Sequence, residues 1–126
     1  MKKFIFVLIL PLLFSCSNNI SDENWDIFYK KFYADSLFQV NRLDNNFVGK
    51  GFYGGENIKK ITKDNWVFLR SGIYDIDTTQ YKTSIVFGKD KVKTRVYVEN
   101  SGIDIRSTFI KHDGKWYLKE YLDNFD

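Results

Sequence analysis

Four β-rich runs in the last third of the chain constrain its fold more than any other feature. They cover residues 83–87, 91–99, 103–111 and 115–122. The connections between them are short and each holds a glycine: Gly88-Lys89-Asp90, Asn100-Ser101-Gly102 and His112-Asp113-Gly114. Short connections with glycine at or near the turn are typical of β-hairpins. The four runs therefore predict an antiparallel meander.

Alternation of side chains predicts that this meander has one dry and one wet face. In the second run, Val92, Thr94 and Val96 face the opposite way from Lys91, Lys93 and Arg95. In the third run, Ile105 and Phe109 face the opposite way from Asp104, Arg106 and Thr108. A sheet with one apolar face needs a second layer to cover that face.

An aromatic stripe near the N-terminus supplies the cover. Trp25, Phe28, Tyr29, Phe32 and Tyr33 follow the spacing i, i+3, i+4, i+7 and i+8, which puts them on one side of a helix. Ser21 or Asp22 is the expected N-terminal cap. The predicted fold class is therefore α+β, with this helix and one or two shorter ones packed in a curved antiparallel sheet.

The middle of the chain gives a weaker pattern. Asp35 and Ser36 could end the first helix or cap a second short helix over residues 37–43. Alternation in residues 37–43 also fits a strand, and the sequence leaves both open. Residues 44–56 contain four glycines and two asparagines, so we expect a loop there with at most a short strand.

The N-terminus has the parts of a secretory signal. Lys2 and Lys3 precede an apolar run over residues 4–10, and Ser15 stands directly before Cys16, which is the one cysteine of the chain. The segment resembles the lipobox of bacterial lipoproteins, in which the cysteine receives lipid and becomes the new N-terminus. The alternative is an ordinary signal peptide with a chance cysteine.

The lipobox resemblance implies a division of the chain and a location. Residues 1–15 would be the signal peptide, 16–20 a lipidated tether and 21–126 a single α+β domain. The partner implied is a membrane, reached through acyl chains such as palmitate on Cys16. Ser17 follows the cysteine, where an aspartate would retain an enteric lipoprotein at the inner membrane. We therefore expect a cell-envelope protein, at the outer membrane rather than the inner.

Composition bounds the classes of function. The chain is 18% aromatic, which suffices for a core without metal or disulfide help. Its formal charge of +3 falls to +1 when Lys2 and Lys3 leave with the signal. A near-neutral domain has no electrostatic footprint for nucleic acid, so no nucleic-acid partner is expected.

The motifs of common enzymes are missing from the sequence. His112 is the one histidine and falls in a predicted turn, so no zinc site of the usual ligand types can be assembled. There is no phosphate-binding loop, dinucleotide fingerprint or nucleophile elbow. We predict no metal, no cofactor and no catalytic residue.

The closing hairpin of the meander reads Phe109-Ile110-Lys111-His112-Asp113-Gly114-Lys115-Trp116-Tyr117-Leu118. Together with the aromatic helix, this hairpin resembles the cone-shaped fold of nuclear transport factor two and its relatives. More narrowly, Trp25 to Phe32, Asp35-Ser36-Leu37-Phe38-Gln39 and Arg42 resemble an uncharacterised family of small Gram-negative lipoproteins with that fold. The resemblance implies a fold and a cellular location, and it implies no reaction. It also implies that a homodimer is possible, as many cone-fold proteins pair through the sheet.

A site in such a fold would lie inside the cone. The residues expected to bind a ligand there are Tyr33, Asp35, Thr94 and Ser107. The leading hypothesis is a non-catalytic domain that binds a small apolar ligand or a protein partner of the envelope. The alternatives are a cone-pocket enzyme of isomerase or dehydratase type, which needs a buried carboxylate, and a structural or toxin-neutralising lipoprotein.

Overall fold

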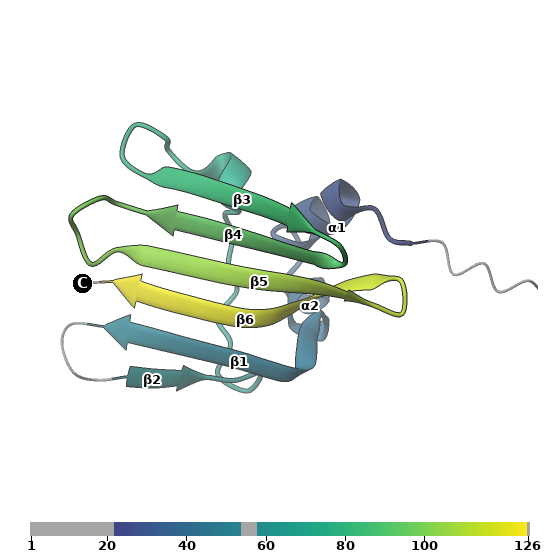
Figure 1. The fold of residues 1–126 in the computed structure, drawn as a ribbon. Coiled ribbons are helices and arrows are strands. Elements are labelled where there is room, and N and C mark those ends of the chain that lie inside the picture. Colours follow the sequence, from purple (N-terminus) through teal and green to yellow (C-terminus); the bar gives the residue numbers. More distant parts are fainter. Residues whose placement is uncertain (1–21, 54–57, 126) are drawn as a thin grey trace, which may run out of the picture.

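A curved, mixed six-stranded sheet carries two short helices on one of its faces (Figure 1). This computed structural model describes residues 22–53 and 58–125. Cys16 and the predicted signal and tether lie outside the described residues. Along the sheet the strand order is β2-β1-β6-β5-β4-β3. No helix in the described part of the chain is long and apolar enough to cross a membrane.

The predicted meander is confirmed as four consecutive antiparallel strands. They are β3 (Lys82–Gly88), β4 (Lys91–Tyr97), β5 (Asp104–His112) and β6 (Lys115–Phe125). Each of the three connections holds a residue with positive φ: Asp90, Asn100 and Asp113. Asparagine and aspartate tolerate this left-handed conformation better than most residues.

Two expectations about the sheet are wrong. Residues 44–56 were expected to be mainly loop, but most of them belong to strand β1 (Leu43–Tyr53). The sheet was expected to be antiparallel, but it is mixed, because β1 pairs parallel with β6 and antiparallel with β2 (Ile58–Ile61). Gly49, one of the glycines that suggested a loop, serves strand packing instead. A Cβ on Gly49 would lie 2.8 Å from Cβ of Ile61 and 2.9 Å from the ring of Phe47, so only glycine fits there.

The helices begin at side-chain caps. Helix α1 (Trp25–Phe32) starts at Asn24, whose Oδ1 accepts a hydrogen bond from the N–H of Ile27 at 3.1 Å, so the expected cap at Ser21 or Asp22 is wrong. Asp35 caps helix α2 (Ser36–Asn41) in the same way through the N–H of Phe38. The segment 37–43, left open by the sequence, is therefore mostly helical.

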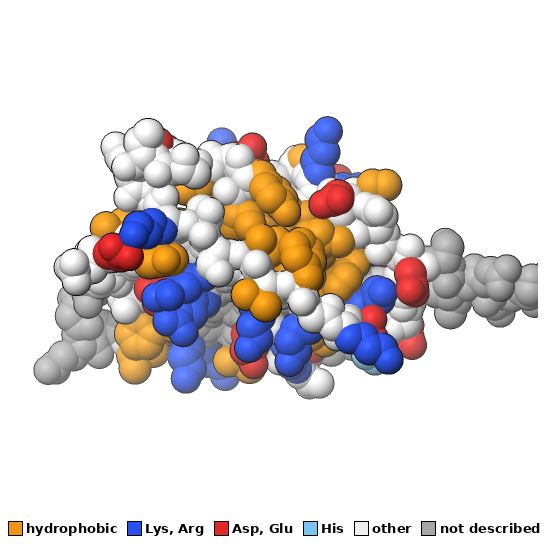
Figure 2. All heavy atoms as spheres, turned by 45° about the horizontal axis from the view of Figure 1, so that its top comes forward, with side chains coloured by type: hydrophobic (Ala, Val, Ile, Leu, Met, Phe, Trp, Pro, Cys, Tyr) orange, Lys and Arg blue, Asp and Glu red, His pale blue; other side chains and the backbone are white. Residues whose placement is uncertain are grey.

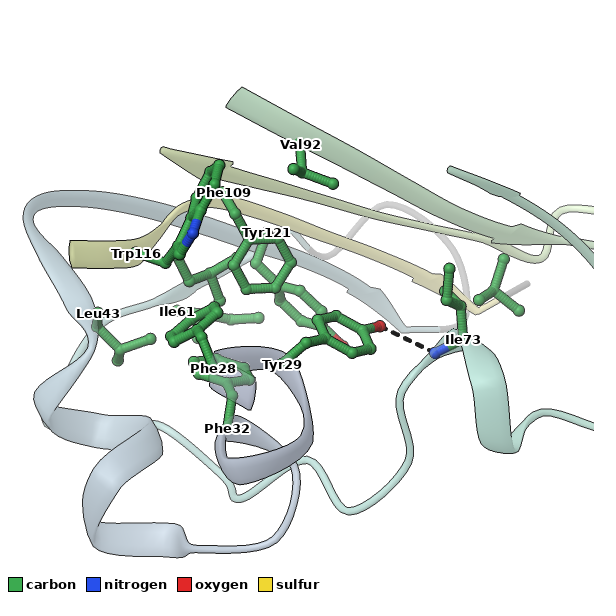
Figure 3. Packing of buried hydrophobic residues seen from close by; sticks show 12 residues of the cluster. Phe28, Tyr29, Phe32, Leu43, Ile61, Ile73, Val92, Phe109, Trp116 and Tyr121 are labelled. Carbon is green, nitrogen blue, oxygen red and sulfur yellow. Dashed lines mark hydrogen bonds between the residues drawn. The ribbon is translucent and has the colours of Figure 1, made fainter. Parts of the chain in front are cut away.

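The core lies between α1 and the sheet, centred on Phe109 (Figure 3). The ring of Phe109 is fully buried and lies 5.2–5.9 Å, centroid to centroid, from four rings of α1, which belong to Trp25, Phe28, Tyr29 and Phe32. Such edge-on contacts stabilise beyond the area that they bury.

Gln39 of α2 fixes the loop that crosses the helix side of the sheet. Its side chain is fully buried, and its amide donates to the carbonyls of Phe32 and Leu69 at 2.8 and 2.9 Å. Its carbonyl oxygen accepts from Trp66 Nε1 and from the N–H of Leu69. A buried amide with all its bonds made orders what it touches, so Gln39 sets the position of the loop at residues 66–69.

A polar clamp fixes the point where the chain enters the fold. Glu23 accepts two hydrogen bonds from Arg42, at 2.6 and 3.0 Å, and one from the N–H of Trp116 at 2.9 Å. Arg42 also donates to the carbonyl of Trp116. Burial raises the pKa of Glu23, but the bonds from Arg42 and Trp116 and the attraction of Arg42 and Lys115 outweigh burial and lower it.

The clamp predicts a pH-dependent contribution to stability. Because the pKa of Glu23 is lowered by folding, its contribution is present above its usual pKa of 4.5 and is lost as pH falls through the folded value. We expect Glu23→Gln to lower the free energy of unfolding by about 1.5–3 kcal/mol at pH 7 and by much less at pH 3. Urea denaturation at both pH values measures this difference.

Glu99→Gln is the matched control, because Glu99 forms an exposed pair with Lys82. It should change stability by less than about 0.5 kcal/mol at either pH. Equal losses for Glu23→Gln at pH 7 and pH 3 would contradict the assigned role of the carboxylate.

Candidate functional site

A pocket of about 360 Å³ lies between the sheet and the loop that Gln39 fixes. Its floor comes from β4, β5 and β6, and its walls come from the end of α1 and from residues 68–76. The lining residues are Tyr33, Phe68, Leu69, Arg70, Ser71, Ile73, Ile76, Thr94, Val96, Ile105, Ser107 and Tyr121. Three of the four residues predicted to bind a ligand are among them.

Thr94 and Ser107 form the polar part of the floor. They are directly opposite each other on β4 and β5, and each is 5% exposed. Both point to the helix side because the alternation of these strands places Val92, Val96 and Phe109 on the same face. These two hydroxyls can donate hydrogen bonds to a ligand or accept them from it.

Tyr33, the residue that ends α1, brings a third hydroxyl into the pocket. It is hydrogen-bonded to Tyr29 and to Ser107. Burial raises the pKa of Tyr33 well above its usual value, and the neighbouring Tyr29 raises it further; burial also raises the pKa of Tyr29. Both phenols are therefore neutral at pH 7 and serve as hydrogen-bond donors and acceptors.

Tyr29 also holds one wall of the pocket in place. Its hydroxyl accepts a hydrogen bond from the N–H of Ile73 at 2.9 Å, across the gap between α1 and the short 3₁₀ helix η1 (Ile73–Asp75), as Figure 3 shows. Gly72 makes this approach possible, since a Cβ there would lie 2.7 Å from the Tyr29 ring. The tyrosine and the glycine together place Ile73 at the pocket.

Asp35 is not part of the pocket, contrary to expectation. It is exposed, and its carboxylate caps α2 through the N–H of Phe38 at 3.0 Å. The local capping bond explains its place at the helix start without a ligand.

Sequence reasoning missed Tyr121, which is 6% exposed and lines the floor. The even-numbered Trp116 and Leu118 point inward on β6, so simple alternation places Tyr121 outward. The pairing of β5 with β6 shifts by one residue between Thr108 and Phe109, which leaves an extra residue on β6 before Tyr121. This β-bulge reverses the alternation and turns Tyr121 inward.

Hydroxyls, aliphatic groups and one guanidinium line the pocket, and among its described lining residues there is no carboxylate, imidazole or thiol. Of the usual general acids and bases, the described lining residues supply only the phenols of Tyr33 and Tyr121. In residues 22–53 and 58–125, no three His, Cys, Asp or Glu side chains gather closely enough to hold a metal.

The arrangement is that of a helix-covered α+β domain with an apolar, hydroxyl-bearing pocket, and solved structures share its fold. An NTF2-like protein from Bacteroides fragilis matches 81% of this chain with a TM-score of 0.52 at 14% identity. The match covers 47% of that protein, so the chain spans about half of its length. A cystatin-like protein from Bacteroides caccae matches 82% of this chain and 77% of its own, with a TM-score of 0.60 at 24% identity.

The protein-family model "-like" matches residues 23–126. The chain therefore belongs to that family, an uncharacterised one with an NTF2-like fold. No curated protein matches the chain in sequence.

Removing the Tyr29 hydroxyl should loosen the pocket wall. We expect Tyr29→Phe to lower the free energy of unfolding by about 1–3 kcal/mol, because it leaves the buried N–H of Ile73 without a partner. Amide hydrogen exchange should speed up at residues 72–75 more than in the core strands.

Tyr74→Phe is the matched control, since Tyr74 is 61% exposed and its ring packs against Tyr29. It should leave both stability and exchange nearly unchanged. If the two variants behave alike, the hydroxyl of Tyr29 does not hold the wall.

Proposed function

We propose that this protein is a lipid-anchored cell-envelope protein whose domain binds a small, largely apolar ligand in the pocket between the sheet and residues 68–76. The observation that carries the proposal is the pocket itself, in which buried hydroxyls stand among apolar side chains. Its volume of about 360 Å³ falls within the range of small-molecule sites.

The side chains that line the pocket indicate the chemistry of the ligand. Ile73, Val96 and Ile105 offer apolar contact, so most of the ligand would be hydrocarbon-like. Thr94, Ser107 and Tyr33 offer neutral hydrogen bonds close together, which suit a hydroxyl, carbonyl or ester group. Arg70 is exposed at the edge of the pocket and is the residue suited to a carboxylate at one end of the ligand.

The N-terminal pattern supports the anchor. Lys2, Lys3 and the apolar run before Cys16 resemble a lipoprotein signal, with residues 1–15 removed, 16–20 as tether and 21–126 as the domain. Ser17 after the cysteine supports the outer membrane as its destination. Two or more acyl chains would make the attachment effectively permanent.

Ligand binding predicts a thermal shift that depends on the pocket. We expect a screen of fatty acids, sterols and apolar metabolites against the full-length protein in detergent to give a hit. At about 100 times its Kd, a ligand adds about 2.7 kcal/mol of stability, enough to raise the Tm by about 10 °C.

Ser71→Trp should abolish that shift, because Ser71 is an exposed residue at the pocket edge and the indole would cover the opening. Thr78→Trp is the control, since Thr78 is exposed in the same loop and does not line the pocket. A hit that both variants retain would show binding elsewhere, and a screen without hits would contradict a small-molecule role.

The anchor predicts a defined modification. Mass spectrometry of the protein isolated from expressing cells should show a chain that begins at Cys16 and carries acyl groups, and the protein should float with membranes. Cys16→Ser should abolish acylation and release the protein from membranes, while Ser17→Ala should do neither. An unmodified Cys16 in the wild-type protein would refute the anchor.

A further inference from the structure

The face of the sheet away from the helices is hollowed into a groove of about 600 Å³ that runs across β1, β6, β5, β4 and β3. Four of its lining side chains are cations: Lys50, Lys93, Arg95 and Arg106. Glu120 is its one acidic lining residue among the described part of the chain. Figure 2 shows lysines and arginines gathered over the lower part of the visible surface, where this outer face comes into view.

The strand register places like charges directly opposite each other on this face. Lys50 of β1 faces Lys60 of β2, and Arg95 of β4 faces Arg106 of β5. Like charges in these positions destabilise a sheet. Interactions within the domain therefore do not explain the Lys50–Lys60 pair.

The arginine pair has a counter-ion and the lysines do not. Asp104 accepts hydrogen bonds from both Arg95 and Arg106, with N–O distances of 3.0 and 2.8 Å in the two ion pairs. Lys50, Lys60, Lys91 and Lys93, which the register and alternation place on the same face, form no ion pair with any described residue. Cations therefore outnumber acidic side chains on this face.

The positive charge of the outer face restricts which partners can bind it. A second copy docked through the same face would bring these cations against their own equivalents, so the outer face is poorly suited to a homodimer. An anionic surface would satisfy them. Val48 and Val86, 51% and 60% exposed in the same groove, add apolar contact between the charges.

The chain enters the fold at one end of the sheet. Glu23 donates its N–H to the carbonyl of Gly114 in the β5–β6 turn at 2.8 Å, and Asp22 pairs with Lys111 of β5. A tether of residues 16–20 would span at most about 17 Å. A bilayer holding Cys16 is then close to this end of the sheet, where α1 also begins. The helices lie on one face of the sheet and the groove on the other (Figure 1).

From these observations we propose that the outer face of the sheet docks on the phosphate-bearing anionic headgroups of the membrane that holds the tether. The proposal rests on the lipid anchor of the proposed function. An acyl anchor and a basic patch act together in membrane attachment, and the patch sets the orientation of the domain. Docked this way, the outer groove lies against lipid and the ligand pocket opens away from it.

Lysine footprinting tests the orientation on the protein as it is isolated from membranes. The protein is reconstituted in vesicles of phosphatidylethanolamine alone or with three parts in ten phosphatidylglycerol, and its lysines are acetylated and mapped by mass spectrometry. At low salt we expect the anionic vesicles to reduce labelling of Lys50 and Lys93 by about threefold or more, and about 0.5 M NaCl to remove the protection. Lys30 and Lys31 on α1 should label equally in both.

Charge reversal supplies the matched pair of variants. Lys93→Glu should remove the protection of Lys50 in anionic vesicles, and Lys30→Glu should leave it intact, because Lys30 is exposed on the helix that covers the other face. Both substitutions are at exposed positions, so both variants should fold, and circular dichroism checks this.

The outcomes separate the face from the anchor. Flotation with neutral vesicles depends on the anchor alone. A protein that does not float with them would refute the anchor, while the docking of the outer face is judged separately by the lysine labelling. Equal labelling of Lys50 and Lys93 in the two kinds of vesicle would overturn the proposed docking. Equal protection by inorganic phosphate without vesicles would also overturn it, since the groove would then be a site for a soluble anion.

Discussion

The contact between Phe109 and the aromatic side of helix α1 holds the two layers of this protein together. Phe109 lies in the middle of β5 and is fully buried beneath four rings of α1. A helix of eight residues is too short to be stable alone, so its structure depends on this packing. The sheet depends on the same contact, because without the helix its dry face would meet water.

Polar interactions then decide where the remaining segments lie on this apolar contact. Arg42 and Glu23 bind the chain entry to Trp116, while Gln39 binds residues 66–69 to the two helices. Tyr29 takes part in both the apolar contact and the polar interactions. Its ring packs on Phe109, and its hydroxyl accepts a hydrogen bond from the N–H of Ile73. The walls of the pocket are thus positioned by buried hydrogen bonds, whose geometry is more specific than that of apolar packing.

The two faces of the sheet carry different chemistry on the same strands. On β4, Thr94 faces the pocket while Lys93 and Arg95 face the outer groove, and on β5 Ser107 lies between the outward Arg106 and Thr108. Strand alternation makes this division possible, because adjacent residues point to opposite sides. One short sheet can therefore present neutral hydroxyls to a ligand and cations to an anionic surface.

Local patterns in the sequence determined the meander, the aromatic helix side and the inward position of Thr94 and Ser107, because alternation, helical spacing and turn chemistry act over a few residues. Only the tertiary structure decided the parallel pairing of β1, which depends on the close approach of Gly49 to Ile61, and the inward turn of Tyr121, which depends on a bulge between strands. Contacts between distant segments control these features, and a linear pattern does not record such contacts.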